Sequence, residues 1–153
     1  MEWLTGLRGA VVGLDTAPLI YFIEENSLYL PLVRPSFQAV DRGDFQLVAS
    51  VLTLTEVLVH PLRRSDYRLA DQYRRVLLHA RQVTTVHVSD AIAEEAAELR
   101  AKHGLRTPDA IQLATAIRSG ASSFLTNDTR LPSLPNLSIL VLNQLKASLP
   151  YRV

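Results

Sequence analysis

The stretch from Thr107 to Asp128 constrains the fold most, because it predicts a helix that leads directly into a buried strand. Thr107 is a good N-cap, and Pro108 follows at a position where a helix has no N–H partner to lose. Apolar residues then recur at helical spacing as far as Ile117, and Gly120 can end the helix in a left-handed conformation. This helix is expected to pack one apolar face against a core.

A short apolar run, Ser123 to Thr126, follows the helix and is closed by the turn residues Asn127 and Asp128. Such a run is typical of a buried strand. Asp109 falls in the first turn of the preceding helix, and Asp128 falls at the carboxyl end of the strand. In an open α/β sheet, ligand sites form where helices begin and strands end, so acids at these two positions indicate a possible ligand site.

The remainder of the chain alternates between apolar runs and helical patterns. Further strands are expected at residues 10–14, 46–52, 83–88 and 137–142. Further helices are expected after Asp15, from a capping box at Thr53, after Ser65, and from Ser89 to Gly104. The alternation predicts a single α/β domain over residues 1–153, a three-layer α/β/α sandwich around a mainly parallel central sheet with right-handed crossovers.

Two segments carry no strong pattern. Residues 26–35 contain Pro31 and Pro35, which predict an irregular connection before a short helix at about 36–40. The C-terminal tail that follows the last predicted strand shows no clear element.

Composition narrows the class of protein. With 153 residues, 48% of them hydrophobic, the chain is long enough to bury a substantial core. It has no cysteine, which excludes disulfides and thiolate chemistry and is compatible with a reducing cytoplasm. No apolar run reaches membrane-spanning length, so we expect a cytoplasmic protein without a membrane partner. The formal net charge of +1 favours neither nucleic acid nor an acidic partner.

Four acids are expected at one edge of the sheet. Asp15 directly follows the first strand, Glu56 comes just after the second, and Asp128 follows the strand at 123–126. The carboxyl ends of parallel strands share one edge, and Asp109 joins them if its helix begins there. Each acid alone has a capping or turn explanation, including the capping box for Glu56. Their joint placement favours a site, because capping requires no common edge.

Carboxylates gathered in this way need a cation. Two of them about 4 Å apart repel by roughly 4 kcal/mol at an effective dielectric constant of about 20. Mg²⁺ or Mn²⁺ would relieve the repulsion and leave coordination positions for a phosphate. Such ions activate water and polarise a phosphodiester, which is the chemistry of a metal-dependent nuclease. The histidines show no ligand spacing, and the sequence lacks the glycine motifs that bind nucleotide phosphates.

The same motifs resemble those of the PIN-domain family. An apolar strand ending in Asp15, the Thr-x-x-Glu at Glu56, TPDAIQLATAI with Asp109 and LTND with Asp128 follow the order and spacing of that family. Within it, the chain is similar to the VapC-like toxin ribonucleases of type II toxin–antitoxin pairs. The resemblance implies an α/β/α fold and a pocket in which these four acids bind Mg²⁺ or Mn²⁺ and carry the catalysis.

The resemblance also implies supporting residues and partners. Thr16 would support the first acid, and Thr126 would lie beside the fourth. The implied activity is endonucleolytic cleavage of RNA by a homodimer whose pocket a cognate antitoxin blocks. Asp128 matches the least constant acid of the family, and Leu131 stands where relatives often carry an aromatic residue. PIN domains also act in RNA processing, so the resemblance fits either a toxin or an RNA-processing enzyme.

Basic residues offer a possible RNA contact. Only Lys102 and Lys146 are lysines, and arginine suits bidentate phosphate contacts, although the bias also fits a GC-rich genome. Arg63, Arg64 and Arg68 are either a phosphate-binding face or an ordinary solvated helix face. The alternative to a nuclease is a catalytically inactive PIN-like module that binds RNA or a protein partner.

Overall fold

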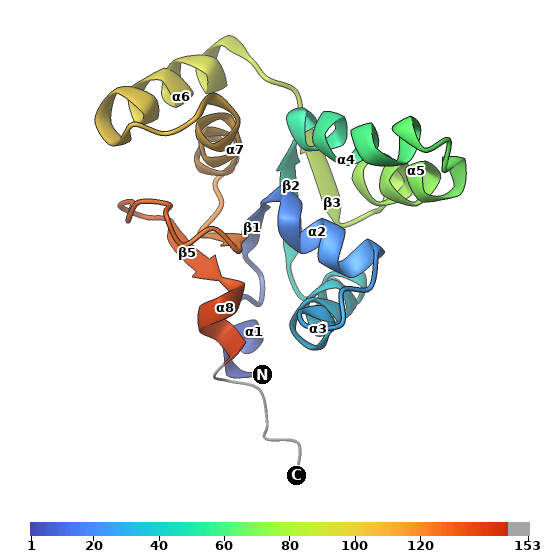
Figure 1. The fold of residues 1–153 in the computed structure, drawn as a ribbon. Helices are drawn as coiled ribbons and strands as arrows, with labels where there is room; N and C mark the ends of the chain where they lie inside the picture. Colours follow the sequence, from blue (N-terminus) through green and yellow to red (C-terminus); the bar gives the residue numbers. More distant parts are fainter. Residues whose placement is uncertain (147–153) are drawn as a thin grey trace.

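The computed structural model describes residues 1–146 and contains a five-stranded, entirely parallel sheet (Figure 1). Its strands are β1 (Val11–Leu14), β2 (Gln46–Ser50), β3 (Val83–Val86), β4 (Ser123–Thr126) and β5 (Ser138–Val141). They lie side by side in the order β3-β2-β1-β4-β5. The prediction of a mainly parallel sheet is confirmed, although four of the five strands are shorter than predicted.

Helices cover both faces of this sheet, as expected of an α/β/α sandwich. They are α1 (Glu2–Thr5), α2 (Thr16–Ile23), α3 (Leu30–Asp41), α4 (Val51–Arg63), α5 (Tyr67–Arg74) with its π-helical extension η1 (Arg75–His79), α6 (Asp90–His103), α7 (Thr107–Arg118) and α8 (Leu142–Leu145). Figure 1 shows α2 to α5 on one side of the sheet and α6 and α7 on the other. The predicted three-layer architecture is confirmed.

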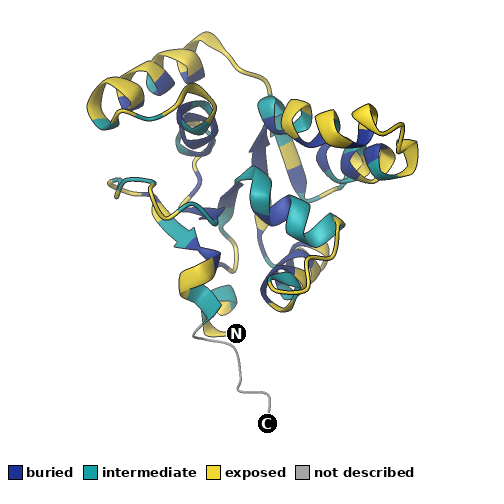
Figure 2. Cartoon of the chain, viewed as in Figure 1, coloured by how far each residue is buried: buried dark blue, intermediate teal, exposed yellow. Residues whose placement is uncertain are grey.

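Each face of the sheet has its own apolar core, because successive strand residues point to opposite faces. Val12 and Leu14 of β1 pack toward α2, α3 and α5, whereas Phe124 of β4 packs toward α6 and α7. Gly13 lies under α7, and a Cβ there would be 2.6 Å from both the Ala116 Cβ and the Phe124 ring. The absent side chain therefore lets α7 approach β1 closely. Figure 2 shows the central strands buried between helices with exposed outer faces, whereas the edge strands β3 and β5 are partly exposed.

The strand order reverses between β1 and β4, and this reversal locates a site. From β1 the chain reaches β2 and then β3 through helices on one face of the sheet. It returns through α6 and α7 on the other face to β4, on the far side of β1. The crossovers from β1 to β3 move across the sheet in one direction on one face, and the crossover from β3 to β4 moves in the opposite direction on the other face. All of these connections are therefore right-handed. Ligand sites in open α/β sheets lie at the carboxyl ends of strands beside such a reversal.

The prediction of an irregular segment at residues 26–35 is wrong in its second half. Helix α3 begins at Leu30 and runs through both prolines, so the short helix predicted at 36–40 is only its C-terminal part. Pro31 lies in the first turn, where its missing N–H removes no helical hydrogen bond. Pro35 lies inside the helix, but Leu32 and the other buried apolar residues of α3 pack into the core. Tertiary packing outweighs the local cost of the proline.

Two predicted helix starts on the β2 side are displaced. Helix α4 begins at Val51, because Ser50 has the extended backbone of an N-cap and its Oγ accepts from Leu52 N at 3.1 Å. There is accordingly no capping box at Thr53. Helix α5 is capped by Asp66. Its neighbour Ser65 has a φ of 54°, in the left-handed region, and so lacks the extended backbone expected of a cap.

On the opposite face, one helix start is displaced and another is confirmed. Helix α7 already includes Thr107, which leaves Arg106 at the N-cap position without a side-chain capping bond. Ser89 caps α6 as predicted, with Ile92 N donating to its Oγ at 3.2 Å. Gly104 ends that helix with a φ of 67°. The chain therefore turns sharply from α6 into α7 at the carboxyl edge of the sheet.

The C-terminal tail, for which the sequence indicated no element, contributes the short helix α8 after β5. Its remaining residues, 147–153, lie outside the part that the structure describes. Over residues 1–146, no helix has both the length and the apolar character needed to cross a membrane.

Candidate acidic site at the carboxyl edge of the sheet

Asp15 stands at the reversal of strand order, where β1 ends beside β4. Its backbone N–H donates to Leu125 O at 3.0 Å, which extends the β1–β4 pairing by one residue. Its Oδ1 accepts from Thr16 N at 2.8 Å and caps α2, and its Oδ2 accepts from the Thr126 hydroxyl at 2.7 Å. Both oxygens of this carboxylate are therefore held in place by strand and helix ends.

Glu56 reaches the same edge from the second turn of α4. Its Oε2 accepts from the Thr16 hydroxyl at 3.1 Å, and its Oε1 accepts from Gln112 Nε2 at 3.2 Å. Gln112 Nε2 also lies 2.9 Å from Thr16 Oγ1 and 3.3 Å from Thr53 Oγ1. Gln112 and Thr53 are buried, so this network joins α2, α4 and α7 beneath the carboxylate of Glu56.

Asp109 and Asp128 complete the edge, and each is paired with an arginine. Asp109 lies in the first turn of α7, and its Oδ2 accepts from Arg106 Nε at 3.2 Å. Asp128 lies two residues beyond β4, and its two oxygens accept from Arg130 Nε and Nη2 at 3.0 and 3.1 Å. The backbone N–H of Asp128 donates to Thr126 Oγ1 at 3.0 Å, so Thr126 links the Asp15 and Asp128 positions.

Neighbouring acids contribute to the pKa of Asp15 and of Glu56. The pKa of Asp15 is raised, mainly by burial and further by the charges of Asp109 and Asp128, against the hydrogen bonds from its threonine partners. The pKa of Glu56 is also raised, first by partial desolvation of its inward-turned carboxylate and then by Asp15 and Asp109. In contrast, the hydrogen bonds from Arg130 lower the pKa of Asp128.

The chemistry of these side chains suits a hard divalent cation. They offer carboxylate oxygens, the ligands that Mg²⁺ and Mn²⁺ prefer, and burial disfavours the charged form of Asp15, which a bound cation would stabilise. Among residues 1–146, however, no three aspartate, glutamate, histidine or cysteine side chains are grouped closely enough to form a ready-made metal site. Asp109 and Asp128 are instead turned toward their arginines. An ion held by all four acids would compete with these arginines for Asp109 and Asp128.

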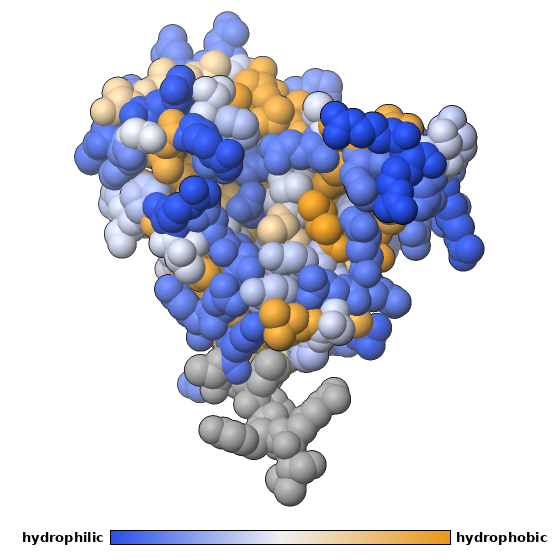
Figure 3. Space-filling model, in the orientation of Figure 1, coloured by the Kyte–Doolittle hydropathy of each residue, from blue (hydrophilic) through white to orange (hydrophobic). Residues whose placement is uncertain are grey.

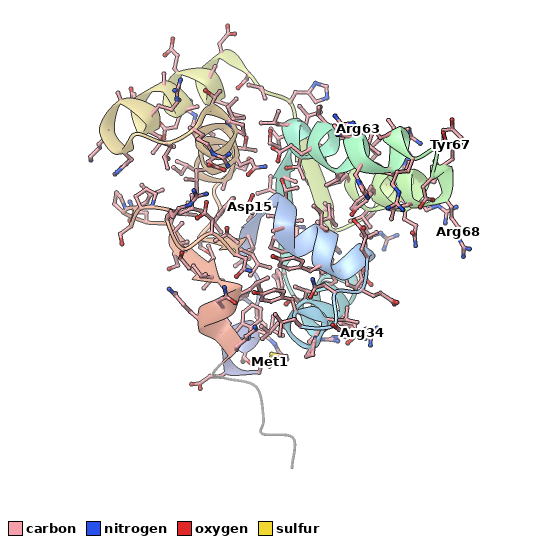
Figure 4. The ribbon with its side chains drawn as sticks, in the orientation of Figure 1. Met1, Asp15, Arg34, Arg63, Tyr67 and Arg68 are labelled. Carbon is pink, nitrogen blue, oxygen red and sulfur yellow. The ribbon has the colours of Figure 1, made fainter. Side chains whose placement is uncertain are left out.

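The arginines predicted as a phosphate-binding face lie away from this edge. Arg63 is two turns beyond Glu56 on α4, about 10 Å along the helix axis. Figure 4 places Arg63 at the end of α4 and Arg68 at the outer end of α5, whereas Asp15 lies at the centre of the molecule. Arg63, Arg64 and Arg68 are all exposed. The surface over this end of α4 and α5 is strongly hydrophilic in Figure 3.

Three residues of the edge were not predicted from the sequence. Gln112 interrupts the apolar face of α7 and follows Asp109 by one helical turn, which is the signal that could have identified it. Arg106 and Arg130 each lie within three residues of an acid, a spacing that permits ion pairing but occurs on many solvated surfaces. Only the fold shows that both pairs meet at the same edge.

The chain is therefore a parallel α/β protein with acidic residues at the carboxyl edge of its sheet, beside the reversal of strand order. Within that class, the chain belongs to the PIN domain family, whose sequence model matches residues 12–137. The match includes all four acids. No curated protein sequence matches the chain significantly.

Several solved structures with a similar fold are bacterial toxins or toxin–antitoxin complexes. A toxin–antitoxin complex from Klebsiella pneumoniae contains a chain 25% identical to this one, with a TM-score of 0.61 over 84% of this chain and 95% of that one. DNA-bound VapBC from Salmonella typhimurium is 15% identical, with a TM-score of 0.65 over 87% and 98% of the two chains. The sarcin-ricin loop cleaving toxin VapC20 of Mycobacterium tuberculosis is 17% identical, with a TM-score of 0.62 over 75% and 87%.

Proposed function

We propose that this protein is an endoribonuclease that depends on a divalent metal, and that it is the toxin of a toxin–antitoxin pair. The observation that carries the proposal is the position of Asp15 at the β1–β4 reversal, within electrostatic reach of Asp109, Asp128 and Glu56. The sarcin-ricin loop cleaving toxin shares the fold, which supports RNA as the substrate class. A cytoplasmic location, where RNA is abundant, is part of the proposal.

The candidate metal ligands are Asp15, Glu56, Asp109 and Asp128, with Mg²⁺ or Mn²⁺ as the ion. When bound, such an ion activates a water molecule and polarises the phosphodiester. Thr16 and Thr126 fix the orientation of Asp15 through one hydrogen bond to each of its oxygens. Thr16 and the buried Gln112 do the same for Glu56. These four acids and their hydrogen-bond donors are the proposed catalytic machinery.

The proposed protein partners follow from the neighbouring structures. The Klebsiella and Salmonella proteins are described as a toxin–antitoxin complex and as VapBC, and this chain spans nearly the whole length of the matched chains. We therefore propose a cognate antitoxin that covers the acidic edge, and a homodimer as the form of the free toxin. An RNA-processing role would need the same catalytic edge but no antitoxin.

The decisive test is cleavage of a mixed pool of transfer and ribosomal RNA by the purified protein, with Mg²⁺, with Mn²⁺ and with chelator. Asp15→Asn, Glu56→Gln and Asp109→Asn should each reduce cleavage by a factor of about 100 or more while the fold is kept. Discrete fragments that require both metal and Asp15 support the nuclease. Cleavage that persists in all three variants would contradict the assignment, and metal binding without cleavage of any RNA would favour the binding-module alternative.

A further inference from the structure

Two of the four proposed metal ligands are already neutralised by arginines of the same chain. Asp109 and Asp128 are partly buried, with side-chain exposures of 18% and 20%, whereas Arg106 and Arg130 are 71% and 76% exposed. The cationic groups thus approach from the solvent side. All four residues line one hollow of about 200 Å³ at the turn between α6 and α7.

The Arg130 pair is built into the turn that follows β4. Asp128 Oδ1 accepts from the backbone N–H of Arg130 at 2.9 Å as well as from its guanidinium. Asp128 is tied through Thr126 to Asp15, since the Thr126 hydroxyl accepts from Asp128 N and donates to Asp15 Oδ2. The guanidinium of Arg130 is therefore held against Asp128, which Thr126 connects to Asp15.

The Arg106 pair is built into the turn before α7. Arg106 occupies the N-cap position, and its side chain folds over the first turn to reach Asp109. Arg106 also lines the same hollow as Asp128 and Arg130. Together the two arginines form a positive rim beside Asp109 and Asp128 in this hollow.

Stability alone does not explain these pairs. Exposed ion pairs contribute little to folding, because water screens them and holding two long side chains costs conformational entropy. A divalent cation bound to the carboxylates of Asp109 and Asp128 would leave both guanidiniums without these carboxylate partners. The planar, two-pronged guanidinium is suited to a phosphate group, which it can bind through two parallel N–H donors.

We propose that Arg106 and Arg130 exchange partners when metal binds: they pair with Asp109 and Asp128 in the metal-free protein and contact phosphates of the RNA strand when an ion holds those acids. The exchange rests on the proposed ribonuclease function. It assigns the two arginines to substrate binding at the site itself, distinct from the exposed arginines at the end of α4. It also makes RNA binding at this rim dependent on metal.

The first test is Mn²⁺ binding to the RNA-free protein, measured by isothermal titration calorimetry. Arg106→Gln and Arg130→Gln each remove a competitor for one carboxylate, so each should tighten Mn²⁺ binding by about two- to fivefold. Arg118→Gln is the matched control, because it removes an exposed arginine from the other end of α7 and should leave Mn²⁺ affinity unchanged. Unchanged or weaker Mn²⁺ binding in both test variants would overturn the exchange.

The second test is the affinity for a fluorescein-labelled single-stranded RNA oligonucleotide across a range of salt concentrations, with the RNA checked for integrity afterwards. With Mn²⁺, each test variant should bind more weakly and reduce the slope of log K against log salt by about 0.7. With chelator, the variants and the wild type should show the same slope, because the arginines then pair with their aspartates. An equal loss in both conditions would mean a permanent RNA contact and would overturn the exchange.

The two proposals fail in different ways. If the wild type cleaves RNA and binds Mn²⁺ but the arginine variants behave like Arg118→Gln, the exchange is wrong and the ribonuclease stands. If the wild type binds no Mn²⁺, the metal-dependent function is wrong and the exchange is wrong with it.

Discussion

Gln112 on α7 donates a hydrogen bond of 3.2 Å to Glu56 on α4, across the carboxyl edge of the sheet. The same Nε2 group also contacts the hydroxyls of Thr16 and Thr53. One buried amide thus connects helices from both faces of the sheet to one of the four acids.

Replacement of Gln112 by Ala should destabilise the protein by about 1–3 kcal/mol, because it leaves the hydroxyl of the buried Thr53 without this partner. It should also reduce cleavage, since one oxygen of Glu56 loses its donor. Urea denaturation and RNA cleavage measure the two effects. Gln144→Ala on the exposed side of α8 is the control, and a Gln112→Ala variant with the stability and cleavage of that control would remove Gln112 from the site.

Replacement of Asp15 by Asn should raise the melting temperature of the metal-free protein. Burial and the neighbouring carboxylates raise the pKa of Asp15, so they disfavour its charged form, and the neutral amide removes that penalty. The amide oxygen can still accept from Thr16 N and cap α2. The variant should in turn lose most of the rise in melting temperature that Mn²⁺ gives the wild type.

Thermal denaturation with chelator and with Mn²⁺ measures both expected effects, the higher melting temperature of the metal-free variant and its smaller response to Mn²⁺. Glu94→Gln, which removes an exposed acid from α6, should change neither curve. An Asp15→Asn variant that melts lower without metal, or that keeps the full Mn²⁺ effect, would contradict the proposed role of Asp15.

Replacement of Gly13 by Ala should destabilise the fold by about 1–3 kcal/mol through overpacking. The new Cβ would lie 2.6 Å from the Ala116 Cβ and the Phe124 ring, so α7 would have to move away from β1. Gly6→Ala is the matched control, because its Cβ would meet its nearest neighbour at 3.6 Å. Denaturant unfolding that shows equal stability for both variants would refute the tight contact between α7 and β1.

Simultaneous replacement of Arg63, Arg64 and Arg68 by Gln tests the predicted phosphate-binding face. If RNA phosphates contact it, RNA affinity should fall and the salt slope should decrease by about 0.7 for each lost contact. The free energy of unfolding should change little, by roughly 0.5 kcal/mol or less, because all three side chains are exposed. Fluorescence anisotropy measures the RNA affinity and its salt slope.

A control variant carries Gln at three exposed arginines elsewhere on the surface, Arg8, Arg81 and Arg118. Equal RNA affinity in the two triple variants would identify the face at the end of α4 as an ordinary solvated surface.

Much of the fold was predictable because its signals are local. The strand at 123–126 was placed to the residue, and α7 was recognised from its apolar spacing and from Pro108. The passage of α3 through Pro35 could not be predicted, since proline disfavours a helix locally and only packing in the core compensates. The cap of α4 was missed because β2 ends at Ser50, two residues before its apolar run stops.

The candidate site was predictable in its acids but not in its contacts. Asp15, Glu56 and Asp128 follow strands, and the carboxyl ends of parallel strands must share an edge. The partner of each acid depends on side-chain directions that no spacing specifies. The pairing of Asp128 with Arg130, for example, was not predicted.

The sequence by itself determined the kinds of elements, their order, the acids at the strand ends and the family, because periodicity and short motifs act over a few neighbouring residues. The tertiary structure alone decided that the strand order reverses between β1 and β4. It also decided that Gln112 supports Glu56, 56 positions away, and that Arg106 and Arg130 form one rim. Contacts between distant residues depend on how helices pack across the finished sheet, and that packing is a property of the whole chain.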